Sequence, residues 1–82
     1  QRVPLGERPL SIGRLPECNI TLNDPNVSRH HAEIRPQGNG FMIVDLGSTN
    51  GVKVNGVRVS QQALADGDQI AIGNTRMQFE AS

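Results

Sequence analysis

Three short polar clusters interrupt the apolar pattern of this 82-residue chain, and each carries side chains that donate hydrogen bonds. They are Gly13-Arg14, Ser28-Arg29-His30-His31 and Ser48-Thr49-Asn50-Gly51. Forked guanidinium groups, hydroxyls and an amide are the donors that suit the acceptor oxygens of a phosphate group. No carboxylate interrupts these clusters. Brought together, they would form a site for one anion.

Catalytic and metal-binding alternatives find little support in the same residues. Ser28 and His31 could serve as nucleophile and base of a small hydrolase, but no G-x-S-x-G elbow surrounds Ser28 and no third residue orients His31. Cys18 with His30-His31 lacks the ligand spacing of metal sites, since adjacent residues of a strand point to opposite faces. Neither glycine-rich nucleotide motif occurs. We therefore expect no enzyme, no metal and no cofactor.

Composition excludes several further classes. Eight Lys or Arg balance eight Asp or Glu, and the chain has no Trp or Tyr, which argues against nucleic-acid binding through phosphates or stacked bases. No apolar run approaches the length that spans a bilayer. One cysteine cannot form an internal disulfide, which favours a reducing, cytoplasmic setting. With Gln1 first and no signal-peptide pattern, we expect residues 1–82 to be one domain excised from a longer protein.

Short alternations of apolar and polar residues predict that strands carry these clusters. No window of about a dozen residues shows helical periodicity. The apolar pairs are Leu10/Ile12, Ile20/Leu22, Ala32/Ile34, Met42/Val44, Val52/Val54, Val57/Val59, Ile70/Ile72 and Met77/Phe79. Eight short strands separated by Gly, Asn, Asp and Pro turns predict a β-sandwich.

The clearest local element is the segment 52–59. Asn55-Gly56 favours a type I′ turn, which pairs Val54 with Val57 and Val52 with Val59 and directs four valines to the core. The same register places Lys53 opposite Arg58 on the other face, a mildly unfavourable pair of like charges.

Several ordered motifs together resemble the forkhead-associated (FHA) domain. They are Ile12-Gly13-Arg14, Val27-Ser28-Arg29-His30-His31-Ala32-Glu33-Ile34, Val44-Asp45-Leu46-Gly47-Ser48-Thr49-Asn50-Gly51-Val52, Val54-Asn55-Gly56, and Leu64-Ala65-Asp66-Gly67-Asp68-Gln69-Ile70-Ala71-Ile72-Gly73. The resemblance covers about residues 10 to 80. It implies an all-β sandwich of two twisted, mainly antiparallel sheets with eleven strands, of which the N-terminal strand is expected to be truncated.

The resemblance also implies a function and a site. Such a domain binds phosphothreonine-containing segments of partner proteins, in trans or within the same polypeptide, downstream of a Ser/Thr kinase. By position, Arg14, Ser28, Arg29 and Thr49 would bind the phosphate. Asn50 would bind the peptide backbone beside it.

Other positions that the resemblance singles out would support or tune this site. Gly13, His31 and Gly51 match residues that shape the loops without touching the ligand. Candidates for reading the third residue after the phosphothreonine are Asn26, Asn74 and Thr75. A phosphate-independent module using the sheet face near Lys53 and Arg58 stays open as an alternative, as does the small hydrolase.

Overall fold

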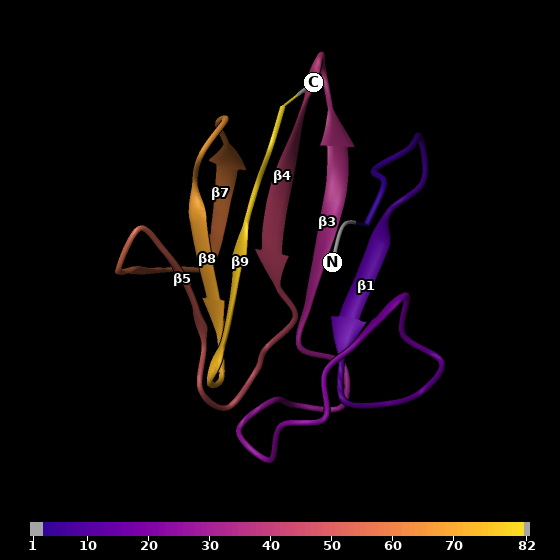
Figure 1. Cartoon of the computed structure of the whole chain (residues 1–82), viewed down its shortest axis with the longest axis vertical. Helices are drawn as coiled ribbons and strands as arrows, with labels where there is room; N and C mark the ends of the chain where they lie inside the picture. The colour runs from indigo at the N-terminus through magenta and orange to yellow at the C-terminus, as the bar shows by residue number, and fades with distance from the viewer. Residues whose placement is uncertain (1–2, 82) are drawn as a thin grey trace.

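The computed structural model describes residues 3–81, so residues 1–2 and 82 of the predicted domain lie outside the described residues. The described part of the chain forms nine strands in two sheets (Figure 1). The strands are β1 (Leu10–Gly13), β2 (Ile20–Thr21), β3 (Ala32–Gln37), β4 (Gly40–Asp45), β5 (Val52–Val54), β6 (Val57–Val59), β7 (Gln61–Leu64), β8 (Gln69–Ile72) and β9 (Thr75–Gln78). Among residues 3–81, no helix is long and apolar enough to cross a membrane.

The two sheets have five and four strands. The five-stranded sheet has the order β2-β1-β3-β4-β7 and the four-stranded sheet the order β6-β5-β8-β9. Every pairing is antiparallel except that of β1 with β2. The predicted all-β sandwich of mainly antiparallel sheets is confirmed. The described residues form nine strands rather than the eleven that the family resemblance implied, with none before Leu10.

Branched aliphatic side chains fill the space between the sheets. Alternate residues of a strand point to one face, so each short strand contributes one or two side chains to the core. Phe79, just after β9, is buried and meets Phe41 of β4 edge to face, with ring centroids 6.0 Å apart. The buried cluster comprises Leu10, Ile12, Val27, Ala32, Ile34, Ile43, Val52, Val54, Ile70, Ile72 and Phe79.

The five-stranded sheet departs from the sequence prediction at two strands. In β4 the apolar pattern indicated Met42 and Val44, but Ile43 is the fully buried residue and its two neighbours are half-buried on the outer face. Strand β7 was missed, because Gln61–Leu64 has neither apolar alternation nor β-branched residues. Its pairing with β4 holds it in place.

The predicted hairpin is correct in register but only partly in burial. Val52 pairs with Val59 and Val54 with Val57, and the turn residues Asn55 and Gly56 both have positive φ, of 52° and 83°. The expectation that four valines face the core is wrong for Val57, which is 62% exposed. Strand β6 lies at a sheet edge, so nothing beyond it covers that side chain.

All three polar clusters lie at one end of the sandwich. There β1 and β4 end and β3 and β5 begin, as their registers show. Figure 1 shows the connecting loops gathered below the sheets at this end, which we call the loop end.

Candidate functional site

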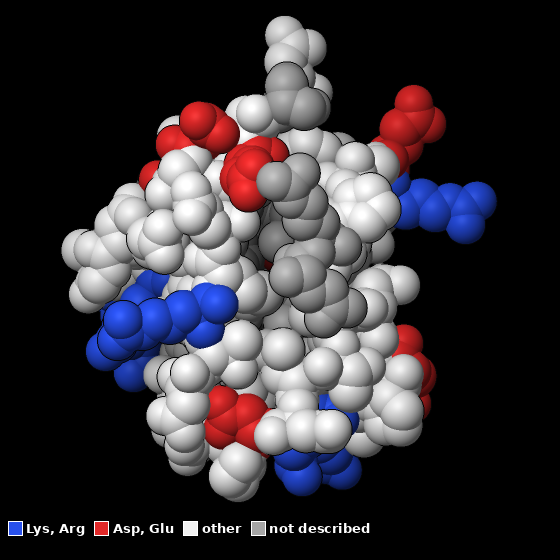
Figure 2. All heavy atoms as spheres, in the orientation of Figure 1, with Lys and Arg blue, Asp and Glu red and all other residues white. Residues whose placement is uncertain are grey.

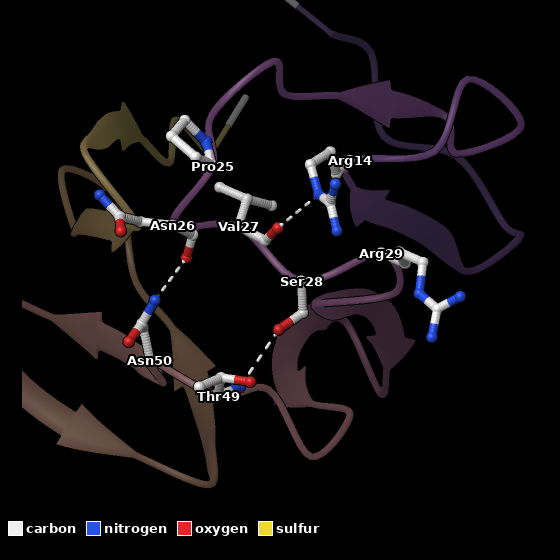
Figure 3. A pocket seen from close by; sticks show the side chains of 8 residues that line it. All are labelled: Arg14, Pro25, Asn26, Val27, Ser28, Arg29, Thr49 and Asn50. Atoms are coloured by element: carbon white, nitrogen blue, oxygen red, sulfur yellow. Dashed lines mark hydrogen bonds between the residues drawn. The ribbon is translucent and has the colours of Figure 1, made fainter.

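The loop end contains a hollow of about 310 Å³ lined by residues from three loops. One loop follows β1, the second precedes β3 and the third joins β4 to β5. The lining residues are Arg14, Pro25, Asn26, Val27, Ser28, Arg29, Thr49 and Asn50, which Figure 3 shows in close view. All five residues predicted to bind the phosphate or the peptide backbone are therefore brought together, and no carboxylate lines this space.

Arg14 is held in place by two hydrogen bonds to backbone carbonyls. Its backbone N–H donates to the carbonyl of Ser28 at 3.1 Å, and its Nε donates to the carbonyl of Val27 at 3.1 Å. Its terminal amino groups bond no residue among 3–81, and the ion pair found in that range joins Arg35 to Glu33 instead. The guanidinium group is thus fixed at one edge and open at the other.

Ser28 joins two of the three loops. Its Oγ accepts the backbone N–H of Thr49 at 3.1 Å, so the hydroxyl proton remains available to an acceptor in the hollow. The side chain of Thr49 is itself exposed. Arg29 is also exposed, and Figure 3 shows its guanidinium extending away from Thr49. Arg29 therefore lines the hollow, but its side chain is not fixed there by a hydrogen bond as that of Arg14 is.

Asn50 forms the second link between these loops. Its Nδ2 donates to the carbonyl of Asn26 at 2.8 Å (Figure 3). An amide carries two N–H groups and one carbonyl oxygen, so one donor and the acceptor stay free beside the hollow. Those two groups are complementary to the backbone of an extended peptide.

His31 lies beneath the hollow and is fully buried. Its Nδ1 accepts the backbone N–H of Ser28 at 3.0 Å, which places the ring proton on Nε2 for donation to the carbonyl of Gly51 at 2.8 Å. Its own backbone bonds Ile12 and Leu46. One imidazole therefore connects the loop before β3 with the loop before β5. His30 is exposed.

Two glycines allow close approaches that shape the site. A Cβ on Gly13 would overlap the carbonyl oxygen of Arg29 and come within 2.9 Å of the Cys18 sulfur. Gly51 has φ of +82°, and its Cα faces the guanidinium of Arg58, to which a Cβ would approach within 2.5 Å. Both residues lie where the resemblance placed supporting glycines.

The candidate specificity residues are only partly brought to the hollow. Asn26 lines it, whereas Asn74 and Thr75 do not. The sequence did not single out Asp24, yet its carboxylate is buried and accepts the backbone N–H of Asn26 at 2.9 Å and of Asn74 at 2.6 Å. This carboxylate ties the loop before β3 to the β8–β9 turn.

The amino-acid sequence matches a protein family and several curated proteins. A family model for the FHA domain matches residues 10–73. The glycogen accumulation regulator GarA of Mycolicibacterium smegmatis is 45% identical over 78 residues, covering 95% of this chain and 49% of that protein. The oxoglutarate dehydrogenase inhibitor of Corynebacterium diphtheriae is 45% identical over 74 residues, covering 89% of this chain and 52% of that protein. The chain spans about half the length of these curated relatives.

Solved structures agree in fold. A structure from work on phosphothreonine-dependent FHA domain interactions has a TM-score of 0.90 at 40% identity, covering 95% of this chain and 81% of that one. EmbR of Mycobacterium tuberculosis, solved in complex with a low affinity phosphopeptide, has a TM-score of 0.85 at 44% identity, covering 88% of this chain and 19% of that one. Because the family model covers most of the sequence and the fold agrees, this chain belongs to the FHA domain family.

Proposed function

We propose that this FHA domain is a binding module for phosphothreonine-containing segments of a partner protein, acting downstream of a Ser/Thr kinase. The segment belongs to a separate protein or to another part of the same polypeptide. The observation that carries the proposal is the convergence of Arg14, Ser28, Thr49 and Asn50 on one hollow without a carboxylate. Each contributes hydrogen-bonding groups that no other described residue occupies.

The phosphate takes the place between Arg14, Ser28 and Thr49. The two terminal amino groups of Arg14 and the hydroxyl proton of Ser28 donate to phosphate oxygens, with the Thr49 side chain beside them. A phosphate carries about −1.5 to −2 charges near neutral pH, and a hydrogen bond to a charged group contributes about 1.5 to 3 kcal/mol. Arg29 adds a second cation when its side chain turns toward the ligand.

Asn50 holds the peptide backbone next to the phosphothreonine through its free amide groups. The peptide loses conformational freedom on binding, which offsets part of the gain from the phosphate. We expect micromolar affinity, on the order of −8 kcal/mol, which suits reversible docking.

Preference for threonine over serine requires an apolar niche for the γ-methyl group. Pro25 and Val27 are the apolar residues that line the hollow. One methyl group that fits a preformed niche contributes about 1 to 3 kcal/mol, so we expect roughly tenfold discrimination or more against phosphoserine.

A regulatory role fits better than an enzymatic one. The relatives carry the names of a regulator and an inhibitor. Among residues 3–81, the serine that hydrogen-bonds a histidine is Ser28, but His31 accepts the backbone N–H of that residue rather than its hydroxyl. The imidazole is therefore not arranged to activate a Ser28 nucleophile. We place the domain in the cytoplasm, where protein kinases supply its ligand.

The decisive experiment is a fluorescence-anisotropy titration with three peptides of one sequence. They carry phosphothreonine, phosphoserine or unmodified threonine at the same position. We expect binding that is strongest for phosphothreonine, weaker for phosphoserine and absent for the unmodified peptide. Equal binding of the modified and unmodified peptides would instead identify a phosphate-independent module, and turnover of an activated ester that Ser28→Ala abolishes would identify a hydrolase.

A further inference from the structure

A row of basic residues crosses the outer face of the four-stranded sheet. Arg58 of β6 pairs with Lys53 of β5, Lys53 with Ala71 of β8, and Ala71 with Arg76 of β9. Cross-strand partners point to the same face, so these four side chains stand side by side. The three cations are exposed, and the half-buried Ala71 adds no charge between Lys53 and Arg76. We call this set the basic row.

The outer face of the five-stranded sheet differs in charge. Its single Arg and single Glu, at positions 35 and 33, bond each other. On the outer face of the four-stranded sheet, the described strand residues beside the basic row are Gln69 and Gln78, which are uncharged and pair with each other. Figure 2 shows basic atoms gathered on the side where Figure 1 draws β5, β8 and β9. The chain has zero net charge, yet the charged strand residues of this face are all basic.

The basic row begins beside the phosphate hollow. The Arg58 guanidinium packs over Gly51, and Gly51 directly follows Asn50, which lines the hollow. Strand β5 then leads from Gly51 to Lys53. A peptide held by Asn50 can therefore continue onto the sheet face without crossing a negatively charged strand residue of that face.

The dimensions suit a short extended segment. Neighbouring strands lie about 4.8 Å apart, so a row across four strands spans about 14 Å. An extended peptide advances about 3.3 to 3.6 Å per residue, so about four residues cover the row. The distance along β5 from Asn50 to Lys53 corresponds to about three more residues.

We infer that the basic row docks an acidic segment of the same partner chain that carries the phosphothreonine. This inference rests on the proposed function. It identifies the ligand as a phosphothreonine flanked by Asp or Glu beginning about three residues away. Carboxylates would lie between Lys53 and Arg76 and beside Arg58, pairing charges that the described chain leaves unpaired.

Charge complementarity favours an acidic peptide over the other polyanions. A duplex nucleic acid is usually held by about six to ten phosphate contacts, and the row has three cations. A lipid surface typically requires a cluster of about four to eight basic residues. A short acidic segment needs only about as many cations as it has carboxylates, and three cations suffice for it.

The test compares phosphothreonine peptides whose flanks are neutral, acidic on the N-terminal side or acidic on the C-terminal side. Each is titrated at low salt against the wild-type domain, the Lys53→Gln/Arg76→Gln variant and the control Arg35→Gln. Arg58 is left unchanged because it packs on the loop that carries Thr49 and Asn50. Thermal melts verify that each variant is folded.

We expect one acidic flank to raise the affinity about three- to tenfold over the neutral peptide, with the gain shrinking at high salt. The double variant should lose that gain while binding the neutral peptide as wild type does, and Arg35→Gln should keep it. Equal affinity for neutral and acidic flanks, or a gain that survives in the double variant, overturns the inference. The inference is also overturned if acidic flanks give no gain in affinity while duplex DNA or an anionic vesicle binds the wild-type domain and not the double variant. Loss of binding to every phosphopeptide would instead contradict the proposed function.

Discussion

Both ends of the sandwich use polar side chains to join loops, but they differ in the groups that those side chains leave free. At the end opposite the hollow, the β5–β6 turn meets the β7–β8 loop. The Asp68 carboxylate accepts the backbone N–H of Ala65 at 2.8 Å and the side-chain amide of Asn55 at 3.0 Å. The Asn55 carbonyl oxygen in turn accepts the backbone N–H of Gln69 at 3.0 Å. We call this set the closed end.

The difference lies in which groups are left over. At the closed end the amide and the carboxylate bond each other and the backbone. At the loop end, Ser28 and Asn50 each use one group to join loops and keep another, while Arg14 uses only Nε. Rigid loops therefore do not distinguish a binding site from a structural turn. The loop end differs because several side chains keep unused donors with no carboxylate among them, whereas the amide of the closed end is bonded to a carboxylate.

The largest expected effect is that of Arg14→Ala. Losing two hydrogen bonds to a charged phosphate should weaken phosphopeptide binding at least about 100-fold, because each contributes about 1.5 to 3 kcal/mol. The melting temperature should change little, since an exposed cation contributes little to folding. Fluorescence anisotropy and thermal melts measure both quantities. Arg35→Ala removes an arginine from the outer face of the five-stranded sheet and should leave binding intact; unchanged binding by Arg14→Ala would contradict the assignment.

His31→Ala should lower both stability and affinity. It removes a fully buried ring and leaves the N–H of Ser28 and the carbonyl of Gly51 without their partner. We expect the free energy of unfolding to fall by about 2 to 3 kcal/mol, measured by urea denaturation. A variant with wild-type stability but no binding would make His31 a ligand contact instead.

Alanine at two glycines compares the ends directly. Gly51 and Gly56 have nearly the same φ, of 82° and 83°, but a Cβ on Gly56 meets nothing within 4 Å. Each Gly→Ala change should cost about 1 to 2 kcal/mol of unfolding free energy, because both force a left-handed conformation. Only Gly51→Ala should also weaken phosphopeptide binding. Equal losses of affinity in the two variants would show that the ends are not independent.

The smallest effect is expected from Asp68. The backbone N–H of Ala65 and the amide of Asn55 hold the pKa of this carboxyl below its ordinary value. A lowered folded-state pKa means that its contribution to stability is complete above the unfolded-state pKa of about 4 and is lost as pH falls through the folded-state value. Melting temperatures of wild type and Asp68→Asn should therefore converge below about pH 4. Phosphopeptide affinity at neutral pH should be equal in both; a weaker Asp68→Asn would connect the two ends.

The convergence of the candidate site residues on one hollow could be predicted because they interrupt the strand pattern. Arg14, Ser28 and Thr49 each lie in a gap between apolar alternations, and short strands bring such gaps to a common end. Asp24 and Arg58 could not be recognised in this way. The first bonds a backbone group fifty residues away, and the second packs on a loop of a different strand pair. Their roles depend on tertiary contacts.

The fold was predictable to a similar degree and for the same reason. Strands with alternating branched residues were found, whereas β7 depends on pairing with β4 and left no pattern of its own. The exposure of Val57 could not be predicted, because the sequence does not reveal which strand lies at an edge. The alternation of apolar residues identifies a strand, whereas the strands beside it determine which of its side chains are exposed.

The imidazole of His31 joins a loop of one sheet to a loop of the other, and this has a consequence for folding. On the proposed function, a ligand held by Ser28 and Asn50 would bind only when both sheets are packed together, so it would bind the native state and not the unfolded chain. Phosphorylation of the partner would then act as a reversible stabiliser of this small domain. At a ligand concentration of about 100 times Kd, the native state gains about 2.7 kcal/mol. A domain weakened elsewhere in its core would thus persist longer while its phosphorylated partner is abundant.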